Sequence, residues 1–266
     1  MIHATSAELY HWVALFLWPL ARIMGLLTVA PLFGNVSVPA RAKIALGVLL
    51  TIIISPGVPP LPASDPASMT GFLILIQQML IGLAMGFAMR VVFAAIEMAG
   101  EVSGMTMGLS FASFFDPQTR GRTSVVSQFV ALIALMLYLA TNMHLVLLAT
   151  LADSFNSLPI SATPLNPLAL REVANWGARI FSGGLQLALP IIAALLVTNL
   201  GLGVLTRAAP QLNLFGIGFP ITLGVGFIML TVTLPYLATP MQNLFEEGMQ
   251  EIAKISAAAF APPAPR

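Results

Sequence analysis

Three charged residues inside one long apolar segment are the first candidates for chemistry. Arg90, Glu97 and Glu101 stand at positions i, i+7 and i+11, which places them in one stripe of a helix. Charges at membrane depth are costly, so such a stripe could form a proton relay or an ion site. The alternative, which we favour, is a helix end that leaves the bilayer with its charges paired to a neighbouring subunit. Arg22, in the first apolar segment, is expected to be buried against a carboxylate or carbonyl groups rather than lipid.

Other residue patterns of active sites are missing from the sequence. The three histidines are scattered without an HExxH pattern, and there is no cysteine. Neither a metal site nor a thiol nucleophile is therefore expected. No GxSxG, GxGxxG or Walker pattern occurs either. The sequence predicts a protein that is not an enzyme and needs no cofactor.

The stretch Met105–Arg122 lies between two strongly apolar segments and belongs fully to neither. Its first half is apolar, and its second half becomes polar after Asp116-Pro117, a pair that biases the chain out of a helix. Lipid cannot accept unpaired backbone groups, so a hairpin here must be buried in protein or line a cavity. We therefore predict that this stretch plugs or gates a pore.

The side chains that would seal such a pore are apolar, because a narrow apolar neck excludes ions by dewetting. The expected seal consists of Met105, Met107, Leu109, Phe111, Phe114 and Phe115. Hinge freedom is expected from Gly104, Gly108 and Gly121, and the turn from Asp116 and Pro117. Methionine is more often an ordinary filler of apolar gaps, but its clustering beside a phenylalanine-rich stretch favours the seal.

The composition predicts a membrane protein. Of 266 residues, 58% are hydrophobic and 8% are charged, whereas an ordinary soluble domain carries roughly 25% charged residues. The net charge of +1 gives no support for nucleic-acid binding, which requires a clustered basic face. The N-terminal sequence MIHATSAELYHW has no basic region and no small-residue cleavage site, so the first apolar run is expected to remain in the mature protein.

Six apolar segments are expected to form helices: 9–30, 44–55, 71–101, 125–151, 177–206 and 214–239. The second is short for a span, so it is expected to be a half-span or a helix buried by its neighbours. Prolines are expected to interrupt three of the segments, at Pro19, Pro190, Pro220 and Pro235. Gly82 and Gly86 are expected to allow close helix packing. If all six segments span, the positive-inside rule places both termini outside the cytoplasm.

Three motifs along the chain resemble one known family. They are RIMGLLTVAPLFGNVSVPARAK at 22–43, GEVSGMTMGLSFASFFDPQTRGR at 100–122 and APQLNLFGIGFP at 209–220. All three resemble the FliR family of the flagellar type III secretion export gate, which has relatives in virulence injectisomes. Their order makes the resemblance specific, and it extends over about 9–254. The implied fold is an all-α membrane protein of long, broken helical hairpins.

The resemblance also implies a domain order and partners. A FliP-like helical part at 1–176, with a plug loop at about 105–122, would precede a FliQ-like hairpin at 177–254 and a disordered tail at 255–266. The turn of the hairpin would contain Pro210, Gln211 and Asn213. The subunit would join FliP-like and FliQ-like subunits in a ring, with an FlhB-like switch protein, and pass unfolded export substrates. It would lie in the bacterial inner membrane at the flagellar basal body, displaced toward the periplasm in the assembled gate.

Two other functions stay open on the residues. A small-solute or ion transporter of the inner membrane would need broken helices in matching halves, of which Pro190 and Pro220 give a faint hint. A membrane enzyme, such as a lipid-modifying transferase, would need a catalytic constellation. Recovery of a multi-subunit ring after gentle solubilisation would favour the export gate. Solute flux through the chain alone in liposomes would favour the transporter.

Overall fold

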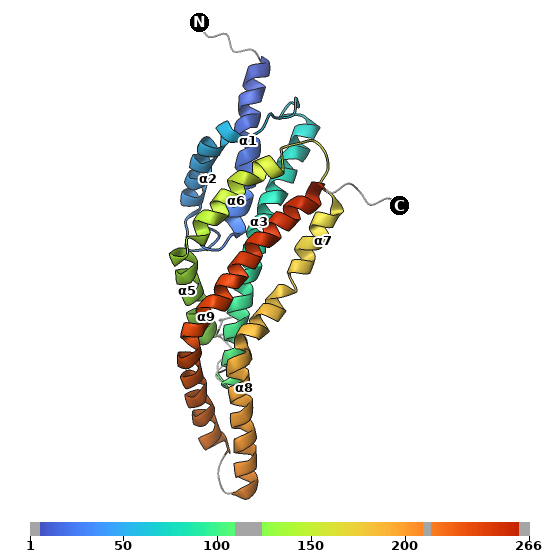
Figure 1. The fold of residues 1–266 in the computed structure, drawn as a ribbon. Helices are drawn as coiled ribbons and strands as arrows, with labels where there is room; N and C mark the ends of the chain where they lie inside the picture. The colour runs from blue at the N-terminus through green and yellow to red at the C-terminus, as the bar shows by residue number, and fades with distance from the viewer. Residues whose placement is uncertain (1–5, 110–123, 210–213, 261–266) are drawn as a thin grey trace, which may run out of the picture. The chain divides into compact units, whose positions relative to one another are not determined.

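The computed structural model describes residues 6–109, 124–209 and 214–260, and these residues form helices and connecting turns (Figure 1). The helices are α1 (Ser6–Val29), α2 (Ala40–Ile54), the short 3-10 helix η1 (Ser55–Gly57), α3 (Met69–Thr106), α5 (Val125–Ala140), α6 (Met143–Ser157), α7 (Pro167–Trp176), α8 (Arg179–Ala208) and α9 (Leu214–Phe260). No β-strand occurs within these ranges, and the all-α prediction is confirmed.

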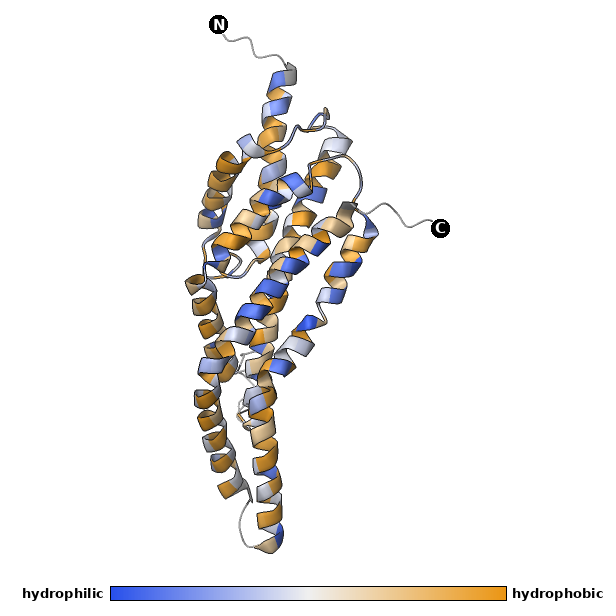
Figure 2. Cartoon of the chain, viewed as in Figure 1, coloured by the Kyte–Doolittle hydropathy of each residue, from blue (hydrophilic) through white to orange (hydrophobic). Residues whose placement is uncertain are grey.

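Five helical stretches of the described chain are long and apolar enough to cross a membrane. They are Glu8–Val29, Ala40–Gly57, Met69–Thr106, Pro167–Ala208 and Gly216–Ala259, and α5 with α6 gives a sixth if the pair is counted as one span. Figure 2 shows that hydrophobic residues cover most of α5 and α8. Water cannot solvate such surfaces favourably, so the chain is a multi-pass membrane protein.

The second helix is longer than predicted. It begins at Ala40, directly after Pro39 in the N-cap position, and η1 prolongs the apolar run to Gly57. Arg41 and Lys43 therefore lie within the first turns of α2 rather than before it. Long basic side chains can extend from a helix end toward water, so their charges do not end the span. The predicted short segment at 44–55 was wrong at its N-terminal end.

The breaks between helices also differ from the prediction. The segment 125–151 divides into α5 and α6 beside Asn142, whose φ of 56° lies in the left-handed region. By contrast, α1 continues through Pro19 and α8 through Pro190. Likewise α9 contains Pro220, Pro235 and Pro240. The predicted interruptions at proline are therefore wrong, because membrane helices tolerate proline where other groups bond the freed carbonyl oxygens.

The chain forms two compact units, which are described separately. Unit 1 comprises residues 1–91, 142–177 and 247–266, and unit 2 comprises residues 92–141 and 178–246. Both α3 and α9 contribute residues to each unit. The sequential division into a FliP-like part at 1–176 and a FliQ-like part at 177–254 stays a prediction.

In unit 1, α1 packs against α3 through glycine. A Cβ added to Gly25 would lie 2.5 Å from the Met79 carbonyl oxygen, and one added to Gly82 would overlap the Arg22 carbonyl oxygen. Gly86 faces the same helix. The two backbones therefore touch, and the close packing predicted for Gly82 and Gly86 is confirmed.

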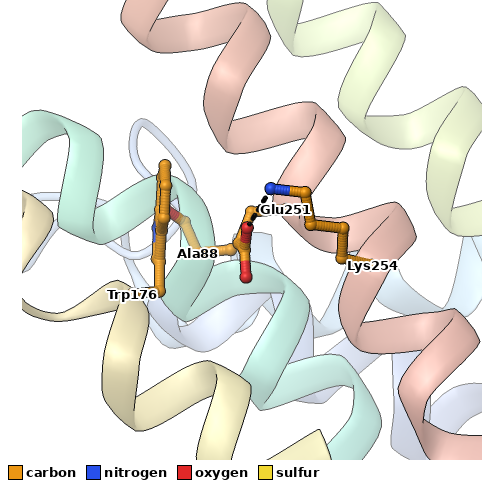
Figure 3. Close-up of polar contacts among 4 residues, drawn as sticks. All are labelled: Ala88, Trp176, Glu251 and Lys254. Atoms are coloured by element: carbon orange, nitrogen blue, oxygen red, sulfur yellow. Dashed lines mark hydrogen bonds and ion pairs between the residues drawn. The ribbon is translucent and has the colours of Figure 1, made fainter.

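Within unit 1, a tryptophan side chain joins α7 to α3, and an ion pair lies within the C-terminal part of α9 (Figure 3). The Trp176 Nε1 donates a hydrogen bond of 2.9 Å to the Ala88 carbonyl oxygen and so fixes α7 to α3. On α9, the Lys254 Nζ lies 3.1 Å from Oε2 of Glu251, whose side chain is buried. This contact keeps the carboxylate paired where water has little access.

The helix α9 reaches Phe260, beyond the point where a disordered tail was predicted. Ile255, Ser256 and Ala259 are buried in unit 1, and their burial stabilises the last helical turns. The prediction of a tail from residue 255 was therefore wrong for residues 255–260. The remaining residues of that tail, 261–266, lie outside the described ranges.

The core of unit 2 contains an aromatic cluster drawn from three helices. Phe93 of α3, Tyr138 of α5 and Phe245 of α9 have ring centroids 5.3 to 5.6 Å apart. Within the same unit, α8 and α9 lie side by side (Figure 1), and a Cβ on Gly183 would lie 3.3 Å from the Leu244 side chain. These two helices cover most of the range of the predicted hairpin, whose turn residues lie outside the described ranges.

Candidate functional site

The predicted plug falls partly outside the described residues. Met105, Met107 and Leu109 are described, together with Gly104 and Gly108, and they form the end of α3 and the turn after it. The residues outside are Phe111, Phe114, Phe115, Asp116, Pro117 and Gly121, as well as the hairpin-turn residues Pro210, Gln211 and Asn213. Their roles stay predictions, and the site is built here from the two chain ends that carry segment 110–123.

The helix α3 ends in a hydrogen-bonded cap at Gly108. The φ angle of Gly108 is 88°, in the left-handed region that glycine adopts without a Cβ clash. Its N–H donates to the Met105 carbonyl oxygen at 3.0 Å, and the Leu109 N–H donates to the Gly104 carbonyl oxygen at 3.0 Å. This pair of bonds is a Schellman motif. Gly108 thus terminates α3, and its role as a hinge stays a prediction.

Met107, just before this glycine, is fully buried, whereas the Met105 side chain is 55% exposed. The Met107 side chain lies over Gly226 of α9, where an added Cβ would be 2.8 Å from Cε and 2.9 Å from Sδ. One turn earlier on α9, the Thr222 Oγ1 lies 3.0 Å from the Phe219 carbonyl oxygen and 3.4 Å from that of Met107. These contacts fix the end of α3 against α9 within unit 2.

The residues that follow segment 110–123 are fixed at the start of α5 by hydrogen bonds to α3. The Ser124 Oγ accepts a hydrogen bond of 3.3 Å from the Ser127 N–H, and the Ser124 N–H donates at 3.0 Å to Glu101 Oε2. The Ser127 Oγ donates at 2.6 Å to the Glu97 carbonyl oxygen. A Cβ on Gly104 would lie only 2.6 Å from the Ser124 Oγ. The N-terminus of α5 therefore rests directly on α3.

Leu109 and Ser124, the described residues that flank segment 110–123, both contact α3, and these contacts are called the base of the segment. Gly104 accepts the capping hydrogen bond from Leu109 and also touches Ser124, so it contacts both ends. Loops whose ends are close together and held by helices commonly carry function, because the scaffold positions them. This base is the candidate functional site.

Two residues of the predicted charged stripe, Glu97 and Glu101, accept hydrogen bonds at this base. Arg90 belongs to unit 1, whereas Glu97 and Glu101 belong to unit 2. Glu101 accepts the bond from α5, and the Glu97 backbone accepts another. Within the described ranges, no group of three or more histidine, aspartate or glutamate residues could hold a metal ion. A relay, ion site or subunit contact at these charges stays a prediction.

Arg22 forms a second polar centre, fully buried in unit 1. Its Nε donates to Gln78 Oε1 at 2.8 Å, and Nη2 donates to the same oxygen and, at 2.8 Å, to the Leu158 carbonyl oxygen. Its Nη1 donates to the Ser154 carbonyl oxygen at 2.8 Å and to Oγ at 3.1 Å. The Phe155 ring centroid lies 4.2 Å from the guanidinium carbon. Arg22 therefore joins α1 to α3, to α6 and to Leu158, the residue that follows α6.

Two residues of these centres were not identified from the sequence. Gln78 is polar within the apolar run 71–86, and this property alone could have marked it as a buried partner. Its Nε2 is buried and has no hydrogen-bond partner among the described residues. Gly226 was noted only as a small residue that shares its helix with Gly224, and the sequence does not distinguish the two. Gly224, two residues earlier, looks equivalent in sequence, yet a Cβ there would meet no described atom within 4 Å.

Comparisons with known proteins agree on one family. Residues 13–248 match the family model described as bacterial export proteins, family 1. The chain is 44% identical over 255 residues to the flagellar biosynthetic protein FliR of Pectobacterium carotovorum subsp. carotovorum, covering 96% of this chain and 97% of that protein.

Two further relatives give the same result. The chain is 42% identical over 257 residues to the flagellar biosynthetic protein FliR of Escherichia coli K12, and the match covers 96% of this chain and 97% of that protein. It is 30% identical over 248 residues to the protein of that name from Bacillus subtilis 168, and the match covers 91% of this chain and 94% of that protein. These matches confirm the resemblance drawn from the three motifs. The chain therefore belongs to family 1 of the bacterial export proteins.

Proposed function

We propose that the chain is a channel subunit of the export gate of flagellar type III secretion. It helps form and plug the pore that passes unfolded flagellar proteins across the inner membrane, and flagellum assembly depends on it. The observation that carries this proposal is the identity of 42% to 44%, over nearly the whole chain, to relatives named flagellar biosynthetic protein FliR. The multi-pass, all-helical structure suits a wall element of a conduit.

The partners are FliP-like and FliQ-like subunits in a hetero-oligomeric ring, with an FlhB-like switch protein, at the basal body in the inner membrane. The apolar outer surface of α8 supports this assembly, because large side chains along it lack cover in the single chain. They are Phe181, Leu185, Leu189, Leu196, Val197, Leu200 and Val204. Neighbouring subunits or lipid would cover such a surface in the ring.

The plug is the stretch from Met105 to Arg122, and the geometry of its base supports this assignment. The described residues that flank segment 110–123, Leu109 and Ser124, both contact α3. The same stretch contains Phe111, Phe114 and Phe115. Apolar side chains that meet in a narrow neck leave no stable water column for ions to follow, which closes the pore between export events.

The subunit assignment is tested by removing the gene from the cell that encodes this chain. We expect loss of secreted flagellin and of flagella, with both restored by the wild-type gene. Gentle detergent extraction of the tagged chain should yield a ring much larger than the 28.1 kDa subunit. A homogeneous monomer, together with normal flagella in the deletion strain, would refute the assignment.

The plug is tested by replacing Phe111, Phe114 and Phe115 together with serine. We expect a higher ion conductance across the inner membrane while export persists, because a polar neck stays hydrated. The amount of assembled ring serves as the control for folding. If conductance is unchanged in a normally assembled ring, the plug role is refuted and the subunit assignment is left intact.

A further inference from the structure

We propose that the cavity between α6 and the C-terminal part of α9 is a docking site for a lysine or arginine side chain of a neighbouring subunit, with Asp153 as the counter-charge. The inference rests on the proposed function, because the neighbour is another subunit of the export gate. All residues that line the cavity belong to unit 1. The proposal adds a specific polar contact to an assembly whose other proposed contacts are apolar.

The cavity has a volume of about 330 Å³, and five of its eight lining residues are polar: Thr150, Asp153, Ser154, Ser157 and Ser256. Ser154 and Ser256 are buried, whereas Asp153 and Ser157 are exposed, so the cavity leads from the surface into the unit. Ligand sites measure roughly 300 to 1,000 Å³. This cavity is at the lower end of that range and suits one long side chain.

Three hydroxyl groups of the cavity have only acceptor capacity left. Thr150, Ser154 and Ser256 each donate the hydroxyl proton to a carbonyl oxygen three or four residues earlier in the same helix, at 2.6 to 2.8 Å. A hydroxyl group carries a single proton, so only lone pairs remain for a ligand. The ionised carboxylate of Asp153 is likewise an acceptor only. The occupant must therefore be rich in hydrogen-bond donors.

The Asp153 carboxylate is also without a counter-charge in the chain. Among the described residues, its side chain forms no hydrogen bond and no ion pair. Lys254 is paired with Glu251, and the N–H groups of Arg22 are bonded elsewhere in unit 1. A carboxylate that a neighbouring subunit removes from water without a partner is costly. The occupant must therefore be positively charged as well.

A lysine or arginine side chain meets both requirements, because it carries a positive charge and has donors but no acceptor. Ser154 gives an example inside the chain, since its Oγ accepts from Arg22 Nη1 at 3.1 Å while it donates to its own helix. A phospholipid headgroup would place anionic phosphate oxygens against a wall of acceptors. The chemistry of the wall thus favours a basic side chain over lipid.

The first experiment compares Asp153→Asn with its matched control Asp65→Asn, at an exposed residue before α3, in the tagged full chain. Asp153→Asn removes the charge and should reduce the ring recovered by gentle detergent extraction at least about tenfold, whereas the control should match the wild type. Asp153→Glu keeps the charge and should retain more ring than Asp153→Asn. The purified single chain should melt at the same temperature in all variants, because the Asp153 side chain bonds to no described residue.

Each outcome of this comparison decides the matter. Equal ring recovery for Asp153→Asn and Asp65→Asn would overturn the inference and leave the gate assignment intact. A single chain that Asp153→Asn alone destabilises would show that the carboxylate serves folding, which also overturns the inference. A wild-type chain that yields no ring would refute the gate assignment, and the inference with it.

A second pair of variants tests the cavity with the charge kept in place. Ala253 is exposed and lines the cavity, so Ala253→Leu should fill part of it and lower ring recovery. Ala174→Leu, at an exposed position of α7, is the control and should assemble like the wild type. Equal assembly of the two variants would show that no side chain enters the cavity.

A labelling measurement reports whether the cavity is covered in the ring. The chain contains no cysteine, so Ala257→Cys introduces a single thiol at an exposed lining position and leaves Asp153 intact. Maleimide should label this thiol at least about tenfold more slowly in the ring than in the single chain, because a docked subunit excludes the reagent. Equal rates in the two forms would overturn the inference.

Discussion

Arg22→Met is the perturbation that tests the buried centre of unit 1 most directly. Methionine keeps an apolar stem but has no donor. Gln78 Oε1 and the Leu158 carbonyl oxygen would then lose the hydrogen bonds that they accept from the guanidinium group. The Ser154 carbonyl oxygen would keep its 2.8 Å bond from the Leu158 N–H. Two buried acceptors therefore bear most of the loss.

The size of the effect follows from these contacts. Each buried acceptor left unpaired costs about 1 to 3 kcal/mol, so two cost about 2 to 6 kcal/mol. Losing the cation–π contact with Phe155 adds about 0.5 to 2 kcal/mol. Removing a buried charge acts in the opposite direction, because burying a guanidinium is itself costly. We expect a net destabilisation of about 2 to 4 kcal/mol, or roughly 5 to 15 °C in melting temperature.

The assay is the melting temperature of the purified chain in detergent, followed by size-exclusion chromatography after heating. Arg41→Met is the matched control, because Arg41 is exposed at the start of α2. Arg22→Lys should recover only part of the stability, since an ammonium group cannot reproduce the fork of the guanidinium. An Arg22→Met chain that melts at the temperature of the Arg41→Met control would refute the reasoning.

Two further predictions concern helix contacts in the described chain. Gln78→Leu should destabilise unit 1 because it removes an oxygen that accepts from two guanidinium nitrogens, and in combination with Arg22→Met the loss of melting temperature should be smaller than the sum. Additive losses would contradict this. Gly82→Ala should abolish the folded, monodisperse chain in chromatography, because its Cβ would overlap the backbone of α1, whereas Gly203→Ala in open surroundings should equal or slightly exceed the wild type. A normally folded Gly82→Ala chain would show that α1 and α3 are not in contact.

The residues in and around segment 110–123 illustrate how far sequence reasoning reached. The sequence was enough to recognise the stretch with Asp116-Pro117 as a break between two apolar segments, because composition and the backbone restriction of proline are local properties. The hydrogen bond that Glu101 accepts at the start of α5 could not be predicted from the sequence. A carboxylate late in an apolar helix is equally consistent with an ion site. The contact between Glu101 and Ser124 appears only in the tertiary structure.

The proline and tail predictions failed for a related reason. Pro190 and Pro220 restrict the local backbone, but whether a helix ends there depends on the groups that surround the freed carbonyl oxygens. Residues 255–260 are rich in alanine and give no strong local signal, and the helix persists there because Ile255 and Ala259 are buried. Tertiary packing decided both outcomes.

The sequence by itself determined that this chain is a helical, multi-pass membrane protein and, through three motifs, its family, because hydropathy, composition and motif order are properties of the chain alone. Tertiary structure decided which residues meet. Gly226 and Gly224 are the same residue two positions apart, yet only one faces Met107. Arg22 showed its charge in the sequence, but its acceptors lie more than fifty positions away on α3 and beyond. Such contacts depend on how helices pack, which no local pattern encodes.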